Sequence, residues 1–347
     1  MSLSNEQIKE IVEGSYLKAD HKFEHPQICL EITGQYGNQI FATFGNFSVF
    51  LSAPKVGKTT ATGIVAISYL LRKQFSNFKS SYPEDKRVLA WVDTEQGKPE
   101  CIRTIQAICS QINGNKTEHP ENFKYLSLRK YGKDIRLDAI EYIVYNTPNL
   151  GFLVIDGVRD LVSSINNEVE ATIIADKLLK WSEEANIHIL TILHQNKGDA
   201  NARGHLGTEL MNKAETVAVL SRGDNNGTRT TIIEPKFARH KEFEPFAFTV
   251  DDDGNIYDAE IKQGFEPKNP TVDQLTGQQQ KSITDYCFLN VQYLPYGKVW
   301  PEIKKALHEL EIEYGDNKCK EVLKRLITER YIGYNEELKH YYSNVPV

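Results

Sequence analysis

The stretch Pro54-Lys55-Val56-Gly57-Lys58-Thr59-Thr60 decides the fold class of this chain. It follows the apolar run 47–51, which is typical of a buried strand, and precedes 61–67, which opens a helix predicted to continue to about Phe75. In a strand, tight loop and helix of this kind, the loop's backbone N–H groups and the helix N-terminus point at one place, which suits the phosphates of a nucleotide. Gly-Lys-Thr alone is common by chance, but the strand before it and the helix after it favour a phosphate-binding loop.

Two side chains of this loop are predicted to act on the phosphates. Lys58 can reach the β and γ phosphates, and the Thr59 hydroxyl can ligate Mg²⁺. The pattern G-x-x-x-x-G-K-[ST] fails at its first glycine, where Ser52 stands, so that position must accept an ordinary backbone conformation. The predicted nucleotide-binding residues are Ser52, Ala53, Pro54, Lys55, Val56, Gly57, Lys58, Thr59 and Thr60.

Length and composition indicate a globular chain. Its 347 residues allow one large core and a smaller domain, and 40% hydrophobic with 25% charged residues is ordinary for such proteins. The net charge of −6 argues against a chain that coats nucleic acid through overall positive charge, but a local basic channel stays open. Five cysteines without C-x-x-C spacing indicate reduced thiols. With no apolar run near 18 residues and no signal-peptide pattern at the N-terminus, a cytoplasmic location is predicted.

The pattern along the chain predicts an α/β core with a mostly parallel sheet that is covered on both faces. Short apolar strands at 87–93, 151–156 and 187–193 alternate with helices at 98–112, 134–145 and 168–185. A lead-in, 1–46, contributes a helix at 5–14 and strands at 28–33 and 39–44. After the core, strands at 216–221, 228–234 and 246–250 are predicted to extend the edge of the sheet in antiparallel fashion.

Four segments follow from this pattern: the lead-in 1–46, which packs either on the core or on a neighbouring subunit, the α/β core 47–260, a linker 261–280 and a C-terminal domain 281–347. The last segment is predicted to hold three helices and a hairpin, the layout of a winged helix-turn-helix with 317–330 in the recognition-helix position. Its ten Lys and Arg balance ten Asp and Glu, so DNA binding and a protein-contact or packing role both stay open.

A phosphate-binding loop needs a carboxylate for its metal at the end of a second strand. The run Phe152-Leu153-Val154-Ile155-Asp156 supplies one, since burying Asp156 after four apolar residues is unfavourable unless a cation or donors satisfy it. The alternative is an Asp that caps the turn into a helix. The loop upstream favours Asp156 as the second Mg²⁺ residue, a Walker B aspartate.

The predicted base for hydrolysis is Glu95. Many enzymes with such a loop carry a Glu directly after the Walker B Asp, but Gly157 stands there. Glu95 follows the carboxyl end of the strand 87–93, which we expect beside the phosphate-binding strand, so its carboxylate would face the γ-phosphate. The alternative for Glu95 is a solvated turn carboxylate. Asp93 is predicted to be a structural partner or an outer contact of the metal.

Polar residues also follow the strand 187–193. His194 or Gln195 could hydrogen-bond the γ-phosphate and report its loss to the polar loop 198–207, which we expect to be flexible. Lys197 and Arg203 could supply charge to a neighbouring subunit's nucleotide, as an arginine finger does. For both cations a solvated surface side chain is the open alternative.

These motifs resemble those of RecA-like ATPases. Within that class, Ser52-Ala53-Pro54-Lys55-Val56-Gly57-Lys58-Thr59, 153–156 and His194-Gln195-Asn196-Lys197 leading to Ala202-Arg203-Gly204 are similar to RepA-type hexameric replicative helicases of plasmids and mobile elements. The resemblance covers about 45–250. Ser52 and the C-terminal domain depart from the minimal helicase.

The resemblance implies a homo-oligomeric ring, a hexamer, with ATP and Mg²⁺ between neighbours and single-stranded DNA in a central channel. It also implies roles for single residues: phosphate and Mg²⁺ binding by Lys58 and Thr59, Mg²⁺ support by Asp156, catalysis by Glu95, sensing by His194 or Gln195, and a finger in trans at Arg203.

Two functions are consistent with the sequence. The first is an ATP-hydrolysing protein that acts on DNA, a helicase or a replication or mobilisation ATPase of a mobile element. The second is a nucleotide-dependent oligomeric switch that recognises DNA or a protein partner without translocation. A small-molecule kinase is disfavoured, because no arginine-rich lid segment follows the helices. Stimulation of hydrolysis by single-stranded DNA would separate the first two.

Overall fold

The computed structural model describes residues 3–22, 25–35, 37–195, 202–225, 228–251, 254–261, 272–310 and 312–344. The chain divides into two compact units, one formed by Met1–Asp224 with Thr228–Ala259 and one by Glu260–Val347 with Asn225–Gly227. No helix in the described ranges has the length and apolar character needed to cross a membrane.

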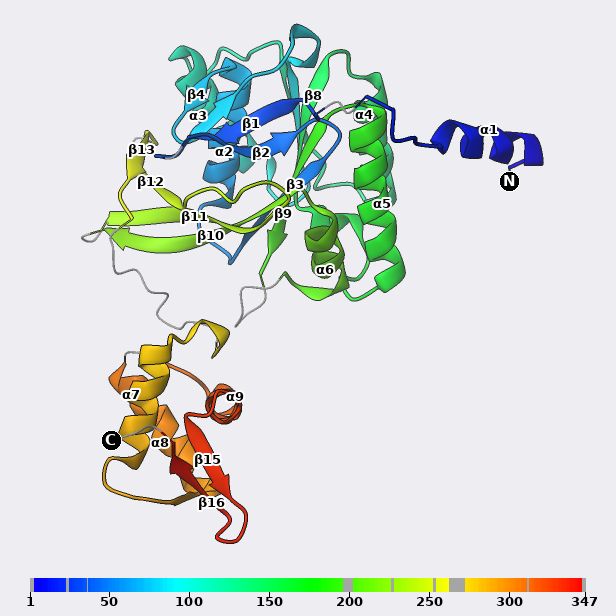
Figure 1. Cartoon of the computed structure of the whole chain (residues 1–347). Helices are drawn as coiled ribbons and strands as arrows, with labels where there is room; N and C mark the ends of the chain where they lie inside the picture. Colours follow the sequence, from blue (N-terminus) through cyan, green and yellow to red (C-terminus); the bar gives the residue numbers. More distant parts are fainter. Residues whose placement is uncertain are drawn as a thin grey trace. The chain divides into compact units, whose positions relative to one another are not determined.

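A large sheet forms the centre of the first unit (Figure 1). In the described part of the chain its order is β13-β12-β11-β10-β3-β9-β8-β6-β7, and the pairs from β10 through β3, β9, β8 and β6 to β7 are parallel. This confirms the predicted α/β class with a mostly parallel sheet. The strands are β3 (Phe47–Ser52), β6 (Val88–Asp93), β7 (Phe123–Ser127), β8 (Leu150–Asp156), β9 (His188–His194), β10 (Thr216–Asn225), β11 (Thr228–Ala238), β12 (Phe246–Val250) and β13 (Ile256–Ala259).

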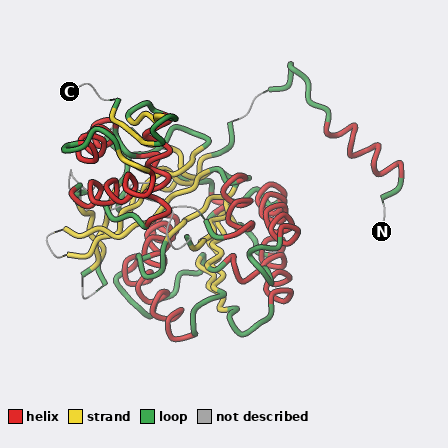
Figure 2. Tube along the Cα trace, turned by 90° about the horizontal axis from the view of Figure 1, so that it is seen from below, coloured by secondary structure: helices red, strands yellow, loops and turns green. Residues whose placement is uncertain are grey.

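Helices cover both faces of this sheet, and Figure 2 shows strands lying between them. Strand β3 is buried along its whole length, with Phe50 in the apolar cluster of one face and Val49 and Leu51 in that of the other. Because side chains alternate along a strand, only a strand covered on both faces is apolar throughout. One face carries α2 (Lys58–Leu71) and α3 (Lys98–Asn113), and the other carries α4 (Lys133–Asn146), α5 (Glu168–Glu184) and α6 (Gly204–Lys213).

The lead-in strands pack on the α2 side of the core. β1 (Ile28–Ile32) and β2 (Gln39–Thr43) join a hairpin, β4 (Gln74–Phe75) and β5 (Phe78–Ser80), that the sequence analysis missed. Their side chains Leu30 and Phe41 belong to the same apolar cluster as α2. The predicted N-terminal helix is present as α1 (Asn5–Ser15), which begins at a capping box and buries none of its residues.

Three predictions about this unit are wrong. Helix α2 ends at Leu71 rather than near Phe75, because Arg72 takes a left-handed conformation (φ 50°) and closes the helix. Strand 87–93, now β6, does not lie beside β3, since β9 and β8 separate them. Strand 216–221 is part of β10, which runs parallel to β3 because helix α6 supplies the crossover that a parallel connection needs.

The second unit holds helices α7 (Gly277–Phe288), α8 (Tyr296–Glu309) and α9 (Asp316–Thr328) around one apolar cluster. A small sheet adds β14 (Leu294–Pro295), β15 (Ile332–Asn335) and β16 (His340–Ser343) in the order β14-β16-β15 within the described residues. The predicted linker 261–280 extends too far. A capping box between Thr276 and Gln279 starts α7 at Gly277, so the three consecutive glutamines are helical.

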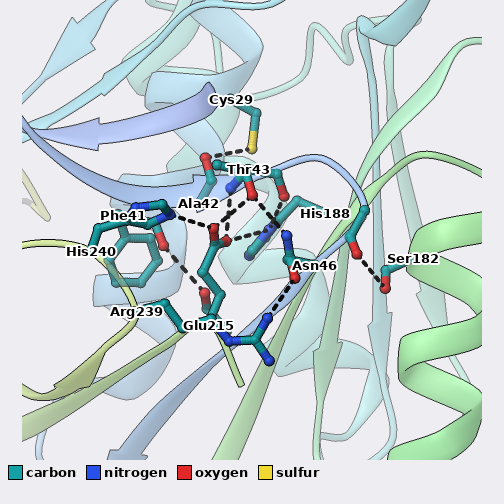
Figure 3. Close-up of polar contacts among 12 residues, drawn as sticks. Cys29, Phe41, Ala42, Thr43, Asn46, Ser182, His188, Glu215, Arg239 and His240 are labelled. Atoms are coloured by element: carbon teal, nitrogen blue, oxygen red, sulfur yellow. Dashed lines mark hydrogen bonds and ion pairs between the residues drawn. The ribbon is translucent and has the colours of Figure 1, made fainter. Parts of the chain in front are cut away.

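A buried carboxylate, Glu215, ties the lead-in to the amino ends of the sheet strands (Figure 3). Its carboxylate accepts hydrogen bonds from the backbone N–H of Thr43 (2.9 Å) and the Thr43 hydroxyl (2.6 Å), and His240 Nε2 lies 3.1 Å away. The fully buried His188 lies behind Thr43, with Nδ1 2.8 Å from the Thr43 carbonyl oxygen. A carbonyl only accepts, so Nδ1 carries the proton, and burial lowers the pKa of His188 from its ordinary 6.5.

His188 should make the fold sensitive to acid. The native histidine stays neutral while the unfolded chain takes up a proton as the pH falls through 6.5, so its contribution is complete above that value and is lost below it. We expect the free energy of unfolding of His188→Asn, measured with urea at pH 8, to be about 1–2 kcal/mol lower than that of wild type. Between pH 6.5 and pH 5 the variant should lose less stability than wild type. The exposed His205→Asn is the control. An unchanged acid slope in His188→Asn would contradict this role.

Candidate active site

The loop between β3 and α2 has the predicted form of a phosphate-binding loop. Gly57 takes a φ of 103° immediately before α2, and a Cβ at this position would lie 2.6 Å from the Thr231 hydroxyl. Thr231 on β11 donates a hydrogen bond to the Val56 carbonyl (2.8 Å), and Arg229 donates one to the Lys55 carbonyl. Strand β11 thus braces the loop from the side, a role that the sequence analysis did not assign to it.

Ser52 fits without strain at the position of the missing glycine. It is the last residue of β3, is fully buried and pairs in register with His194 of β9 and Leu220 of β10. Its φ is not positive, which confirms the expected ordinary conformation, and its hydroxyl donates to the Ala53 carbonyl at 3.1 Å.

Three predicted residues from separate elements meet above this loop. Nε2 of His194 lies 3.0 Å from Nζ of Lys58 and 3.3 Å from Oε1 of Glu95. The hydrogen bond with His194 lowers the pKa of Glu95, and the positive charge of Lys58 lowers it further. The side chains of His194 and Glu95 stay about one-third exposed (34% and 33%), so a ligand can reach both.

Glu95 reaches this place although β6 is separated from β3 by two strands. The turn after β6 is held by Asp93, whose Oδ1 accepts hydrogen bonds from the backbone N–H groups of Glu95 (3.0 Å) and Gln96 (2.7 Å). Tyr125 donates to the other oxygen of Asp93 (2.9 Å). Both oxygens of Asp93 are therefore used within the protein, which favours the structural of its two predicted roles.

Gly157 allows the turn of Glu95 to pack against the end of β8. Its φ is 101°, and a Cβ there would lie 2.3 Å from the Thr94 hydroxyl and 2.7 Å from Cγ of Glu95. The Thr94 hydroxyl lies within hydrogen-bonding distance of the carbonyl oxygens of Asp156 (3.1 Å) and Gly157 (2.9 Å). A side chain at position 157 would therefore displace the carboxylate that the sequence analysis chose as the base.

Asp156 ends β8 and is 3% exposed. Among the described residues, no donor reaches its Oδ2. Burial, followed by the negative charges of Asp93 and Glu95, raises the pKa of Asp156 to about 7.

Gln96 connects Asp156 with Thr59 in the first turn of α2. Its Nε2 lies 3.4 Å from the Thr59 hydroxyl oxygen, and a hydrogen bond from its side chain lowers the pKa of Asp156, against the larger effect of burial. A buried carboxylate with one oxygen that lacks a donor among the described residues, and a hydroxyl oxygen, are ligands that suit Mg²⁺, so Asp156 and Thr59 fit this ion. Gln96 adds an amide that the sequence analysis did not select.

The remaining candidates lie where the chain leaves β9. The backbone of Gln195 donates to the Ser52 carbonyl (3.0 Å) and bridges to Ala202, and the backbone N–H of Arg203 donates to the His194 carbonyl (3.2 Å). Lys197 lies outside the described residues. The predicted loop 198–207 is too long, because α6 begins at Gly204, where the chain turns with a φ of 75°. The Arg203 side chain is exposed directly before this helix.

This geometry defines a P-loop NTPase core. Residues 43–200 match the family model of the AAA domain. The matched stretch runs from the end of β2 to just beyond β9 and contains the loop, Glu95, Asp156 and His194, whereas Arg203 and the second unit lie outside it. It identifies this stretch as a P-loop ATPase-like domain, which supports nucleotide binding and hydrolysis. No curated protein matches the chain.

Replacing the buried acid should separate stability from metal binding. At pH 8 the Asp156 carboxylate is ionised, since this pH lies above its pKa of about 7, and its burial with no donor to Oδ2 among the described residues destabilises the native state. We expect Asp156→Asn to unfold several degrees higher than wild type in EDTA at pH 8. Mg²⁺ with ATP should raise the unfolding temperature of wild type but not that of the variant. A lower unfolding temperature in EDTA would contradict an uncompensated carboxylate at this position.

Proposed function

We propose that this chain is a RecA-like ATPase that hydrolyses ATP with Mg²⁺, and that it works as a homo-oligomer on DNA in the cytoplasm. The observation that carries the proposal is the contact of Lys58, His194 and Glu95 above the P-loop, which joins α2, β9 and the end of β6. A base, a polar side chain and a phosphate-binding lysine within one group of contacts are the parts that γ-phosphate cleavage requires.

The roles of these residues follow from their positions. Lys58 and the N–H groups at the start of α2 bind the phosphates, and Thr59 with Asp156 would hold Mg²⁺. When bound, the metal ion offsets the charge that develops on the phosphates. Glu95 is kept ionised by its lowered pKa, so it can orient a water molecule and accept its proton. His194 touches both Lys58 and Glu95, which suits a side chain that senses the γ-phosphate.

Glu95→Gln tests the base directly. We expect kcat for ATP hydrolysis to fall about 100- to 1,000-fold, because the amide cannot accept the proton, while ATP still binds. Hydrolysis and ATP binding would be measured with and without single-stranded DNA, and the exposed Glu118→Gln is the matched control. A Glu95→Gln protein as active as wild type would exclude Glu95 as the base. DNA-independent hydrolysis in wild type would favour the switch over a motor.

An oligomeric ring is the assembly that this proposal adopts, with Arg203 as a finger for the neighbour's nucleotide. Its support is the exposed guanidinium of Arg203 and the hydrogen bond that fixes its backbone beside His194. Through this bond, a change at His194 can be passed to the start of α6. The hexameric ring size and the link to a mobile element come from the RepA-type resemblance alone.

Mixing two inactive variants tests whether Arg203 acts between subunits. We expect Arg203→Ala to lower kcat about 1,000-fold while ATP binding is kept. A mixture of Arg203→Ala with Glu95→Gln should regain activity, because some interfaces then combine an intact Glu95 with an intact Arg203. Arg222→Ala, also exposed, is the control. Loss of activity without any gain in the mixture would place Arg203 in its own subunit's site or outside catalysis.

For the second unit we propose a winged-helix-like module, with α9 in the position of the recognition helix. The support is its three helices and small antiparallel sheet among the described residues. Several cations of α9 already have partners: Lys320 lies over the Trp300 ring, and Arg325 pairs with Glu329 and Asp273. The balanced charge of this segment left DNA binding and protein contact equally open. Because these cations already have partners within the unit, the structure favours the alternative function, a nucleotide-dependent switch that uses this module to contact a protein.

A further inference from the structure

A cavity of about 220 Å³ opens beside the P-loop helix. Its walls come from three elements far apart in sequence, and include Thr60 and Gly63 of α2, Ala107 and Ile108 of α3, and Val250 and Ile256 around the β12–β13 turn. The cavity starts at Thr59 and Thr60, the turn that faces the phosphates. Pockets that enclose a whole drug-sized ligand measure about 300–1,000 Å³, so this cavity suits one part of a larger molecule.

Gly63 has no packing reason to be a glycine. It lies inside α2, where glycine is among the least favourable residues. A Cβ at this position would meet only Cγ1 of Ile108 at 3.9 Å, an ordinary van der Waals contact. At Gly57, by contrast, a Cβ would lie 2.6 Å from the Thr231 hydroxyl, so the fold requires that glycine. Since Gly63 lines the cavity, a side chain there would occupy space next to the P-loop.

The distances along the helix connect this cavity with the phosphates. Gly63 follows Thr59 by four residues, which is about 6 Å along the axis of an α-helix. A nucleotide whose triphosphate lies at the start of α2 and whose nucleoside points along this helix would bring the nucleoside beside Thr60 and Gly63, which line the same cavity. The wall on α3 combines two apolar residues, Ala107 and Ile108, with two polar ones, Thr104 and Gln111. Such walls hold a flat base by packing and shape rather than by a full set of hydrogen bonds.

We propose that Gly63 is a specificity-determining residue: it is glycine so that the nucleoside of a bound nucleoside triphosphate can lie against α2 in this cavity. The inference rests on the proposed ATPase function and deepens it. It makes the triphosphate group and the nucleoside two separable parts of the ligand, the first held by the P-loop and the second by the surface around Gly63.

The test compares ATP with inorganic tripolyphosphate, which carries the phosphates without a nucleoside. Both would be titrated, with Mg²⁺, into the full chain as wild type, Gly63→Ala, Gly63→Leu and Lys58→Ala. Because alanine favours a helix and no packing clash opposes it, Gly63→Ala should unfold about 2–4 °C above wild type. Gly63→Leu should bind ATP at least about 10-fold more weakly while tripolyphosphate affinity stays within about twofold. Gly297→Ala, another open helical glycine, is the control and should bind ATP as wild type does.

The outcomes distinguish this inference from the proposed function. If wild type binds neither ligand, or Lys58→Ala binds both normally, the P-loop function itself fails. If wild type binds ATP and Gly63→Leu weakens ATP and tripolyphosphate equally, or weakens neither, the nucleoside does not lie against Gly63 and the inference is overturned. The inference is supported if Gly63→Leu weakens the binding of ATP but not that of tripolyphosphate, and if Gly63→Ala is more stable than wild type.

Discussion

Three carboxylates at the carboxyl ends of two neighbouring parallel strands determine how this site is built. Asp93 and Asp156 are direct partners in the register of β6 and β8, and Glu95 follows in the next turn. Like charges this close oppose one another's ionisation, so each needs its own compensation. Asp93 accepts hydrogen bonds from backbone N–H groups and from the Tyr125 hydroxyl. Glu95 is hydrogen-bonded to His194 and lies near the positive charge of Lys58. Asp156 retains an oxygen without a donor among the described residues, and burial together with the charges of Asp93 and Glu95 raises its pKa. Of the three carboxylates, Asp156 is therefore the one that a bound cation would stabilise most.

The steric constraint at Gly157 explains why the proposed base, Glu95, follows a different strand from Asp156. The turn after β6 lies so close to the end of β8 that a side chain at position 157 would overlap Thr94 and Glu95. A Glu directly after Asp156 and a Glu at position 95 would therefore compete for the same space. This chain resolves the competition in favour of Glu95, which reaches Lys58 through His194. Gly157 therefore belongs to the same arrangement as Glu95, which follows a strand that two others separate from the P-loop strand.

The sequence indicated which residues lie close together better than it indicated the order of the strands around them. Apolar runs that end in Ser52, Asp156 and His194 are strong signals, since the carboxyl ends of parallel strands meet at one edge whatever their order. Strand order has no such local signal, and the expectation that β6 adjoins β3 was wrong. Glu95 nevertheless lies near Lys58, because His194 contacts both side chains. The hairpin β4–β5 was missed because its strands hold two and three residues, too few for a pattern. Thr231 and Gln96 were missed because their contacts with the loop arise only in three dimensions.

The two ends of β3 show how buried acids of one protein differ. At the amino end, Glu215 is 2% exposed, and its carboxylate is satisfied by Thr43 and His240. At the carboxyl end, Asp156 is equally buried but lacks a donor on one oxygen among the described residues. In sequence the two acids differ in position, since Asp156 ends an apolar strand and Glu215 precedes one, but the sequence does not show which of them has hydrogen-bond partners. A satisfied carboxylate stabilises one arrangement of the chain, whereas an unsatisfied one is stabilised by what it binds. The hydrogen-bond partners, rather than burial, therefore mark Glu215 as structural and support the proposal that Asp156 binds a cation.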